Sequence, residues 1–437
     1  MDFIPHSEED RKNMLKKIGI SDIEELFSSI PEKFRLKEPL KLPKPISEAE
    51  LDSFFSDFEN KKVVSFMGAG AYDHLIPSAI DPIVSRGEFF TAYTPYQAEV
   101  SQGTLQAIYE FQSLIAHLTG LEAANASMYD GASAAAEAAL MAQHINDNKE
   151  IILINDIHPG YIKVIKTFLQ GLEIDILEMN LDEWKEWHNK NPENKICSLV
   201  VQQPTFYGTI KNLEGLADQV HSHDGIFIMI VNPISLALLK TPAEWGADIA
   251  IGEGQPLGMP LSFGGPYLGF FSCLKKYVRK MPGRIVGMTK DSYGKRGFVL
   301  TLQTREQHIR REKATSNICS NQALCALRAT VYLSLLGPKG LKEVAEQSAK
   351  KAHFLSNELS MLKDLSLPEK EPFFNEFVLR LSCDAETIFQ NGLKQGIIPG
   401  IPLSKFFNDR KNDILIAVTE RKTKEDLERL IKFFREG

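Results

Sequence analysis

Short apolar runs alternate with segments of helical spacing between residues 150 and 252. The apolar runs are rich in isoleucine and valine and occupy residues 150–156, 173–179, 195–201, 225–231 and 247–252. Between some of them, in residues 159–170 and 212–223, apolar residues recur at helical spacing. Strands that are buried on both faces have continuous apolar runs, and helices connect them as crossovers. The pattern therefore predicts an α/β domain with a mostly parallel sheet that is covered by helices.

The first 60 residues have a different pattern. Residues 1–60 combine short, charged helical patterns with the proline-punctuated stretch 37–45. Prolines at this density favour an extended connection and end helices. We therefore predict an N-terminal helical arm, a type of segment that often embraces a partner subunit.

The remaining segments predict two domains behind this arm. The alanine-rich residues 132–145 give a strong helix prediction, and further helices are expected from about residue 305 to 336. Together with the predicted sheet they form a large domain over residues 61–337. A long helix from Pro338, followed by alternating strand and helix patterns, predicts a small α+β domain over residues 338–437.

Composition narrows the class of protein. The chain has 437 residues, of which 43% are hydrophobic and 24% charged, as in globular proteins with real cores. Its net charge of -7 comes from acidic and basic residues mixed along the chain, which disfavours a nucleic-acid groove or an anionic membrane surface as partner. The start lacks the apolar core of a secretory signal and no window has the ~20 apolar residues of a membrane span, so we expect a cytoplasmic protein. The five cysteines are scattered without a C-x-x-C pair, which indicates reduced packing thiols and no metal site.

Two polar features lie where α/β sheets bind ligands. Asp130, Gly131 and Ser133 stand at the predicted start of the alanine-rich helix, where free N–H groups and the helix dipole can hold a phosphate. The alternative is an ordinary capped helix, since most helices need such a cap. His158 follows the strand predicted at residues 150–156 and could stack on or protonate a bound ring, although a loop histidine is more often structural.

A cluster of basic residues follows the strand predicted near residue 300. Arg305, His308 and Arg311 fall within one or two helical turns, and arginine forks suit the recognition of carboxylate or phosphate. The alternative is a solvated charged face whose arginines pair with Glu306 and Glu312. The pattern alone leaves both possibilities open.

The segment 91–100, TAYTPYQAEV, is unusually aromatic and polar. It places Tyr93 and Tyr96 among threonines, a glutamine and a glutamate around one proline. Such side chains can line a binding site. They can equally pack in an interface with their hydroxyls bonded to neighbours.

Three segments in this order resemble the P-protein of the glycine cleavage system, glycine decarboxylase, in the branch of the family that has a separate N-terminal subunit 1. They are residues 91–112, 124–140 and 300–329, and the resemblance extends over most of the chain. It implies the aspartate-aminotransferase-like pyridoxal phosphate fold (fold type I), with a large domain and a small C-terminal domain. It also implies that glycine is decarboxylated and its aminomethyl group passed to the lipoyl arm of H-protein.

The sequence departs from pyridoxal phosphate enzymes of this fold at the lysine that forms the Schiff base. Gln255 and Pro256 stand in the turn where histidine and lysine are found in the sister subunit 2, and proline cannot form an aldimine. Asn232 stands where an acidic residue usually pairs with the pyridine nitrogen, and a neutral amide would not keep that nitrogen protonated. The sequence thus indicates that pyridoxal phosphate is bound by subunit 2 and not covalently by this chain.

The resemblance also implies roles for individual residues and partners. In the family the loop at 91–100 contributes to the active site of subunit 2, here with Tyr93, Thr94, Tyr96 and Gln97. A vestigial cofactor site is expected from Asp130, Gly131, Ser133 and His158. Substrate or interface contacts are expected from Arg305, His308, Arg311 and Asn317. The expected assembly is a heterotetramer of two subunits 1 and two subunits 2 that works with H-protein and involves no metal, nucleic acid or membrane.

Two other functions stay open at this point. One is an independent pyridoxal phosphate enzyme, such as an aminotransferase, that uses an unexpected lysine such as Lys290. The other is a non-catalytic scaffold that stabilises subunit 2 and docks H-protein. Visible absorbance of the purified chain would reveal the internal aldimine of the first, and the activity of subunit 2 alone would reveal the second.

Overall fold

The computed structural model describes residues 5–59 and 63–436, and the chain divides into two units, Met1–Lys62 and Val63–Gly437. The outermost residues of the predicted arm and the first two of the predicted large domain lie outside the described residues. Within the first unit are α1 (Glu8–Ile18), α2 (Glu48–Glu59) and two short 3₁₀ turns, Ile23–Phe27 and Glu32–Phe34. No residue of α1 is buried, and apolar side chains of this unit such as Leu36 and Leu42 are exposed.

The second unit is built on a seven-stranded sheet with strand order β2-β8-β7-β6-β5-β3-β4. Strands β3 to β7 run parallel, whereas β8 is antiparallel to both of its neighbours. The mostly parallel sheet predicted from the apolar runs is therefore confirmed. The strand bounds are β2 Ala123–Ala124, β3 Glu150–Ile154, β4 Asp175–Met179, β5 Ser198–Gln203, β6 Ile226–Val231, β7 Ile249–Glu253 and β8 Gly269–Cys273.

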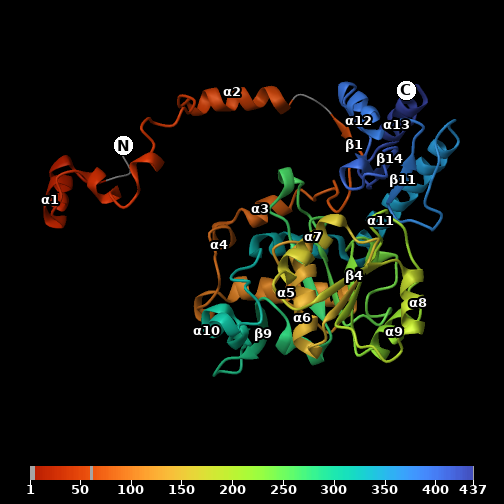
Figure 1. Cartoon of the computed structure of the whole chain (residues 1–437), viewed down its shortest axis with the longest axis horizontal. Helices are drawn as coiled ribbons and strands as arrows, with labels where there is room; N and C mark the ends of the chain where they lie inside the picture. Colours follow the sequence, from red (N-terminus) through yellow and green to blue (C-terminus); the bar gives the residue numbers. More distant parts are fainter. Residues whose placement is uncertain (1–4, 60–62, 437) are drawn as a thin grey trace. The chain divides into compact units, whose positions relative to one another are not determined.

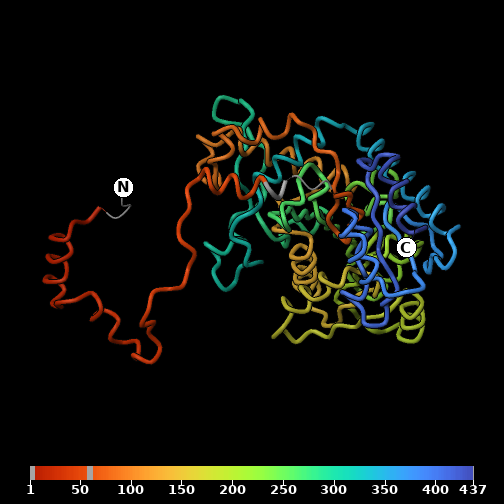
Figure 2. The backbone as a smooth tube through the Cα atoms, turned by 90° about the horizontal axis from the view of Figure 1, so that it is seen from above, coloured from red at the N-terminus to blue at the C-terminus, as the bar shows by residue number. Residues whose placement is uncertain are grey.

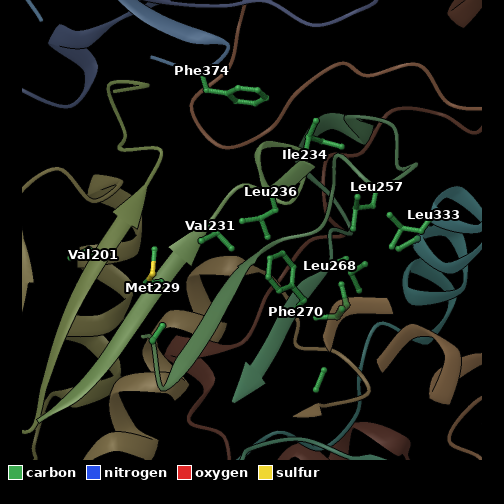
Figure 3. Packing of buried hydrophobic residues seen from close by; sticks show 14 of the residues in the cluster. Val201, Met229, Val231, Ile234, Leu236, Leu257, Leu268, Phe270, Leu333 and Phe374 are labelled. Atoms are coloured by element: carbon green, nitrogen blue, oxygen red, sulfur yellow. The ribbon is translucent and has the colours of Figure 1, made fainter. Parts of the chain in front are cut away.

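Alternate residues of the inner strands β3, β5 and β6 pack into cores on opposite faces of the sheet. In β6, Phe227 and Met229 belong to one hydrophobic cluster, whereas Ile228 and Ile230 belong to another. Side chains of a strand alternate between faces, so a strand with a core on each side has an unbroken apolar sequence. Figure 3 shows the first cluster, in which Leu333 of the long helix α11 points toward the sheet.

Helices cover both faces. The remaining helices are α3 Ile80–Val84, α4 Gly87–Phe90, α5 Gln102–Thr119, α6 Gly131–Asn146, α7 Pro159–Leu169, α8 Leu181–Lys190, α9 Leu216–Ser222, α10 Gln307–Arg310, α11 Ala323–Ser360, α12 Ala385–Lys394 and α13 Lys424–Glu436. Helix α11 is interrupted at Gly337, whose φ is 59°, and continues from Pro338. The predicted domain boundary at residue 337 falls on this kink and stays a prediction. Among the described residues, none of the helices combines the length and apolarity that crossing a membrane requires.

The prediction of helices from about residue 305 to 336 is confirmed in part, because α11 covers the second half of this range, whereas most of the first half is irregular. Before α11 begins at Ala323 there are α10 and the short 3₁₀ turns Gln303–Arg305 and Arg311–Lys313, and both Leu302 and Arg311 have positive φ, 53° and 55°. Residues with side chains rarely adopt this backbone, and it interrupts a helix. Tertiary contacts accompany this interruption, because the Arg305 guanidinium donates to the backbone oxygens of Met281 and Gly283, which are more than 20 residues away in the sequence.

The C-terminal elements form a second core. Strands β11 (Glu376–Arg380), β14 (Asp413–Ala417) and β13 (Ile401–Pro402) make an antiparallel sheet. Next to it, β1 (Val64–Ser65) pairs in parallel with β12 (Ile397–Ile398), and Phe66 is buried in the C-terminal core. These elements lie at the opposite end of the second unit from the hairpin of β9 (Ile285–Lys290) and β10 (Arg296–Thr301) in both Figure 1 and Figure 2.

Candidate active site

A pocket lies at the carboxyl ends of the parallel strands, where α/β sheets bind ligands. Gln202 of β5, Asn232 after β6 and Glu253 of β7 line it. Tyr72 and Glu376 line it as well, from outside the main sheet. The pocket thus joins the main sheet to β11 of the C-terminal sheet.

The first turn of α6 contacts Glu253, which lines this pocket, and the N–H groups of Gly131 and Ser133 are bonded within the chain. Asp130 caps the helix, since its Oδ1 accepts a hydrogen bond of 2.7 Å from Ser133 N and its own N–H donates to Ser133 Oγ at 3.1 Å. Gly131 N donates to Glu253 Oε2 at 3.0 Å. Glu253 Oε1 also accepts from the backbone N–H groups of Gln255 and Leu268, both at 2.9 Å. The place where an anion could bind a helix N-terminus therefore holds a carboxylate of the chain itself.

Burial makes the pocket's carboxyl groups easy to protonate. It raises the pKa of Glu253 to about 7, against the opposing effect of the three N–H donors. Burial likewise raises the pKa of Glu376 to about 7, although Glu376 accepts hydrogen bonds from Ala69 N at 2.6 Å and from the Tyr72 hydroxyl at 2.8 Å. Among the described residues that line the pocket there is no lysine or arginine. An anionic ligand would therefore meet carboxyl groups and no cationic side chain.

The residues at the Schiff-base position have structural contacts. Gln255 is fully buried, and its Nε2 donates to the backbone oxygens of Tyr72 at 3.0 Å and Met259 at 2.8 Å, while its Oε1 accepts from Tyr72 N at 2.8 Å. Pro256 lines the pocket beside it. Lys290 is exposed at the end of β9. The structure thus offers no lysine beside the carboxyl ends of β5, β6 and β7 within the described pocket lining.

His158 lines the same pocket with both ring nitrogens engaged. Its Nδ1 accepts from Gly160 N at 2.9 Å, and Nε2 lies 3.1 Å from the backbone oxygen of Ala69, which only an Nε2–H can bond. Burial lowers the pKa of His158. The ring packs edge-on against Phe206, with centroids 4.9 Å apart. His158 is therefore a neutral capping residue in this chain, and these contacts leave neither nitrogen free for a ligand.

The loop with the two tyrosines belongs to a different part of the second unit. Tyr93 is 73% exposed and Gln97 is exposed, whereas Thr94 is half-buried. The Tyr96 hydroxyl accepts a hydrogen bond of 2.9 Å from Arg284 Nη2. Tyr96 thus joins this loop to the strand region that begins at Arg284.

Arg284 and Glu306 form a buried ion pair that the sequence reasoning missed. Arg284 Nε lies 3.2 Å from Glu306 Oε2, and the side chains are 5% and 8% exposed. His308 adds an edge-on ring contact to Tyr96, with centroids 5.8 Å apart. A signal was present, because Arg284 is a single charged residue inside the apolar stretch MPGRIV, and a charge in that setting is expected to be paired.

The other basic residues of the predicted cluster, Arg305 and Arg311, do not form a common cationic surface with His308. The Arg305 guanidinium donates to the backbone oxygens of Met281, Gly283 and Leu302, and burial lowers its pKa. Arg311 and Asn317 are exposed. Of the cluster, only His308 is in contact with the tyrosine loop through the interactions described above.

Comparisons with known proteins agree over the whole length of the chain. The family model described as "Glycine cleavage system P-protein" matches residues 1–434. A protein of Desulfitobacterium hafniense called "Probable glycine dehydrogenase (decarboxylating) subunit 1" is 49% identical, covering 99% of this chain and 98% of that protein. A similarly named protein of Moorella thermoacetica is 47% identical and covers 100% and 99% of the two chains.

Solved structures are similar as well. The crystal structure of glycine decarboxylase (P-protein) of the glycine cleavage system, in inhibitor-bound form, is 40% identical with a TM-score of 0.87 and covers both chains completely. An alanine–glyoxylate aminotransferase of Nostoc sp., at 14% identity and a TM-score of 0.60, covers 93% of this chain and 98% of its own. The fold is thus the aminotransferase-like fold of type I pyridoxal phosphate enzymes, as the resemblance in sequence implied.

Proposed function

The chain belongs to the glycine cleavage system P-protein family and acts in the glycine cleavage system, and on this premise we propose that it is subunit 1 of glycine dehydrogenase (decarboxylating). In this proposal it works only together with a subunit 2. The pair removes carbon dioxide from glycine and passes the aminomethyl group to the lipoyl group of H-protein. The full-length similarity to proteins named subunit 1 supports this assignment.

The cofactor of the family's fold is pyridoxal phosphate, and the residues of this chain's pocket do not fit it. Covalent binding needs a lysine, and Pro256 stands in the turn that would supply one. The cofactor phosphate needs free N–H donors, and the Glu253 carboxylate already takes the N–H of Gly131. This contact between Glu253 and Gly131 is the observation that carries the proposal. We therefore assign the cofactor to subunit 2 and derive no chemical step through it in this chain.

The contribution of this chain to catalysis is proposed to come from the loop at 91–100. Tyr93 and Tyr96 are 73% and 52% exposed, so a partner can contact both residues. Thr94 and Gln97 stand in the same loop. Hydroxyl and amide groups fixed in place can orient a substrate carboxylate for loss of carbon dioxide, which is catalysis by positioning.

The predicted assembly has two further parts. We propose that the chain pairs with subunit 2 and that two such pairs associate into a heterotetramer. H-protein interacts with this heterotetramer. Exposed apolar residues of the first unit, such as Phe34, Leu36 and Leu42, support an interface there, because large apolar side chains are rarely left in water without a partner. The proposed roles of Arg311 and Asn317 in substrate or interface contacts rest on their exposure in a segment that resembles the family.

Reconstitution with the sister subunit tests the proposal. Decarboxylation is followed as the exchange of labelled bicarbonate into the carboxyl group of glycine, with this chain alone, subunit 2 alone, and both. We expect exchange only with both chains present. Full exchange by subunit 2 alone would reduce this chain to a scaffold, and exchange by this chain alone would make it an independent enzyme.

A further inference from the structure

Arg284 is held rigidly at the start of β9. Its backbone oxygen accepts a hydrogen bond of 2.8 Å from Ala126 N, and its side chain is 5% exposed. The residue before it, Gly283, has a φ of 74°, a backbone conformation that favours glycine. The guanidinium therefore emerges from a fixed backbone and is enclosed by its neighbours.

The Arg284 guanidinium divides its donors between a buried carboxylate and an exposed phenol. Nε contacts Glu306 Oε2 at 3.2 Å, Nη2 donates to the Tyr96 hydroxyl at 2.9 Å, and Cζ lies 5.3 Å from the centre of the Tyr96 ring. Arginine has donors and no acceptor, so the Tyr96 oxygen must accept this bond. The proton of the Tyr96 hydroxyl is consequently left for another acceptor, and the side chain is 52% exposed.

Two buried polar atoms in this corner lack a partner among the described residues. They are Arg284 Nη1 and Thr94 Oγ1. Thr94 is next to Tyr96 in space, because Tyr96 N donates to the Thr94 backbone oxygen at 2.9 Å. Buried polar groups without hydrogen bonds are rare in folded proteins, so the hydrogen bonding of this corner is incomplete among the described residues.

We propose that Arg284 is a positioning residue that holds Tyr96 as a hydrogen-bond donor to a carboxylate in the site formed with subunit 2. The proposal rests on the proposed function, in which the loop at 91–100 faces that site. A phenol whose oxygen accepts from a cation is polarised and becomes a stronger donor. The phenol O–H belongs to the exposed residue of this corner and is a donor, which suits a carboxylate, a group with acceptors only.

A carboxylate at this place has two possible sources. One is the glycine substrate, and the other is an acidic side chain of the partner subunit. Loss of a bond to bound glycine raises KM for glycine, whereas loss of a bond to a partner side chain lowers kcat and leaves that KM unchanged. The kinetic constants of the exchange reaction therefore distinguish the two sources.

A double-mutant cycle tests the proposal on reconstituted complexes. The variants are Tyr96→Phe, Arg284→Lys and the two combined, each checked by size-exclusion chromatography for assembly with subunit 2. Lysine keeps the charge but cannot serve Glu306 and Tyr96 together, since it lacks the planar fork. We expect each single change to lower kcat/KM for exchange by about ten- to a hundredfold. The double variant is expected to lose no more activity than the less active of the two single variants, because both changes remove the same interaction.

Each other result is decisive. If Tyr96→Phe lowers exchange but Arg284→Lys does not, or if the two losses multiply, Arg284 does not act through Tyr96 and the proposal falls while the proposed function stands. If Tyr96→Phe leaves exchange at the wild-type rate, the proposal falls together with the catalytic role of the Tyr96 hydroxyl, while the proposed role of Tyr93 is tested separately.

A second pair of variants covers the case in which Arg284→Lys does not fold. Arg284→Gln combined with Glu306→Gln removes both charges and leaves two amides that can bond to each other, so no buried charge is stranded. Its exchange is expected to fall by about as much as that of Tyr96→Phe, with no further loss when Tyr96→Phe is added. Wild-type exchange by the amide pair would overturn the proposal.

Discussion

Glu253 and Gly131 are joined by a hydrogen bond of 3.0 Å between the carboxylate Oε2 and the backbone N–H. This bond brings the end of β7 to the first turn of α6. A phosphate at this turn would have to displace the carboxylate and would meet its charge. The Glu253 carboxylate thus occupies the place at the N-terminus of α6 where an anion would otherwise bind.

Opening this site should create affinity for phosphate. Glu253→Ala removes the carboxylate and frees the N–H groups of Gly131, Gln255 and Leu268, which then point into the vacated space. We expect the variant to bind inorganic phosphate in equilibrium dialysis at concentrations where the wild-type chain binds none. It should also be less stable to urea by about 1–3 kcal/mol, because buried donors lose their acceptor.

A matched control is Glu376→Gln, which removes the other buried carboxyl group of the pocket without touching α6. It should not gain phosphate binding. Equal phosphate binding by the wild type and Glu253→Ala would show that the carboxylate does not close the site.

The chain should form no covalent adduct with pyridoxal phosphate at its pocket. Pro256 cannot form an aldimine, and Lys290 is exposed on β9, away from the residues that line the pocket. Borohydride reduction in the presence of cofactor, followed by peptide mass spectrometry, should give a stoichiometric label on subunit 2 and only scattered substoichiometric labels here. A single fully labelled lysine in this chain would contradict the assignment of the cofactor.

Tyr93 should matter for turnover and not for folding. It is 73% exposed, so Tyr93→Phe is expected to change the free energy of unfolding by less than about 0.5 kcal/mol. In complexes with subunit 2 it should lower bicarbonate exchange by about tenfold or more if the hydroxyl bonds in the transition state. Tyr293→Phe is a suitable control, because Tyr293 is 87% exposed in the turn after β9. Equal exchange by both variants would leave the Tyr93 hydroxyl without a catalytic role.

The free energy of unfolding should fall as the pH rises from 4.5 toward about 7, because a buried carboxyl group loses its proton in this range. Burial raises the pKa of Glu137 from 4.5 to about 7, although Ser316 Oγ donates to it at 2.8 Å. The folded chain therefore binds more protons than the unfolded chain between these values, and the stabilisation that is complete below pH 4.5 is lost as the pH rises toward 7.

Glu137→Gln removes this dependence and keeps an acceptor for Ser316. At about pH 8 it is expected to raise the free energy of unfolding by about 1–3 kcal/mol, and at about pH 4 to have little effect. Urea unfolding at both pH values measures the difference. The opposite order of effects would mean that Glu137 is stabilised as the anion.

The features that the sequence predicted correctly depend on local patterns. Strands β3, β5, β6 and β7 have nearly continuous apolar runs because they are buried on both faces, whereas the edge strand β4 exposes Asp175 and Glu178. The start of α6 was predicted at Gly131 because an aspartate cap has a local signature. The absence of a usable lysine at Pro256 could also be seen from a single turn of the chain.

The features that were missed depend on partners far away in the sequence. Glu253 bonds to Gly131 and Arg284 to Tyr96, and neither partner can be inferred from spacing. The basic cluster at Arg305 was predicted as a helical face, but its guanidinium instead bonds backbone oxygens from a separate loop. Single charged residues at the edges of apolar runs were the available signal, and they indicate a buried pair without identifying its other member.

The pairing of β1 with β12 constrains how this protein folds during synthesis. Val64 lies opposite Ile397, and Phe66 fills the core made by the C-terminal elements. While the ribosome translates the middle of the chain, the strands of the main sheet can already assemble, but the segment just after the arm has nothing to pair with. It must wait, with Phe66 uncovered, until almost the last residues emerge. During that interval the nascent chain carries uncovered apolar surface, and such surface makes a folding intermediate prone to aggregate.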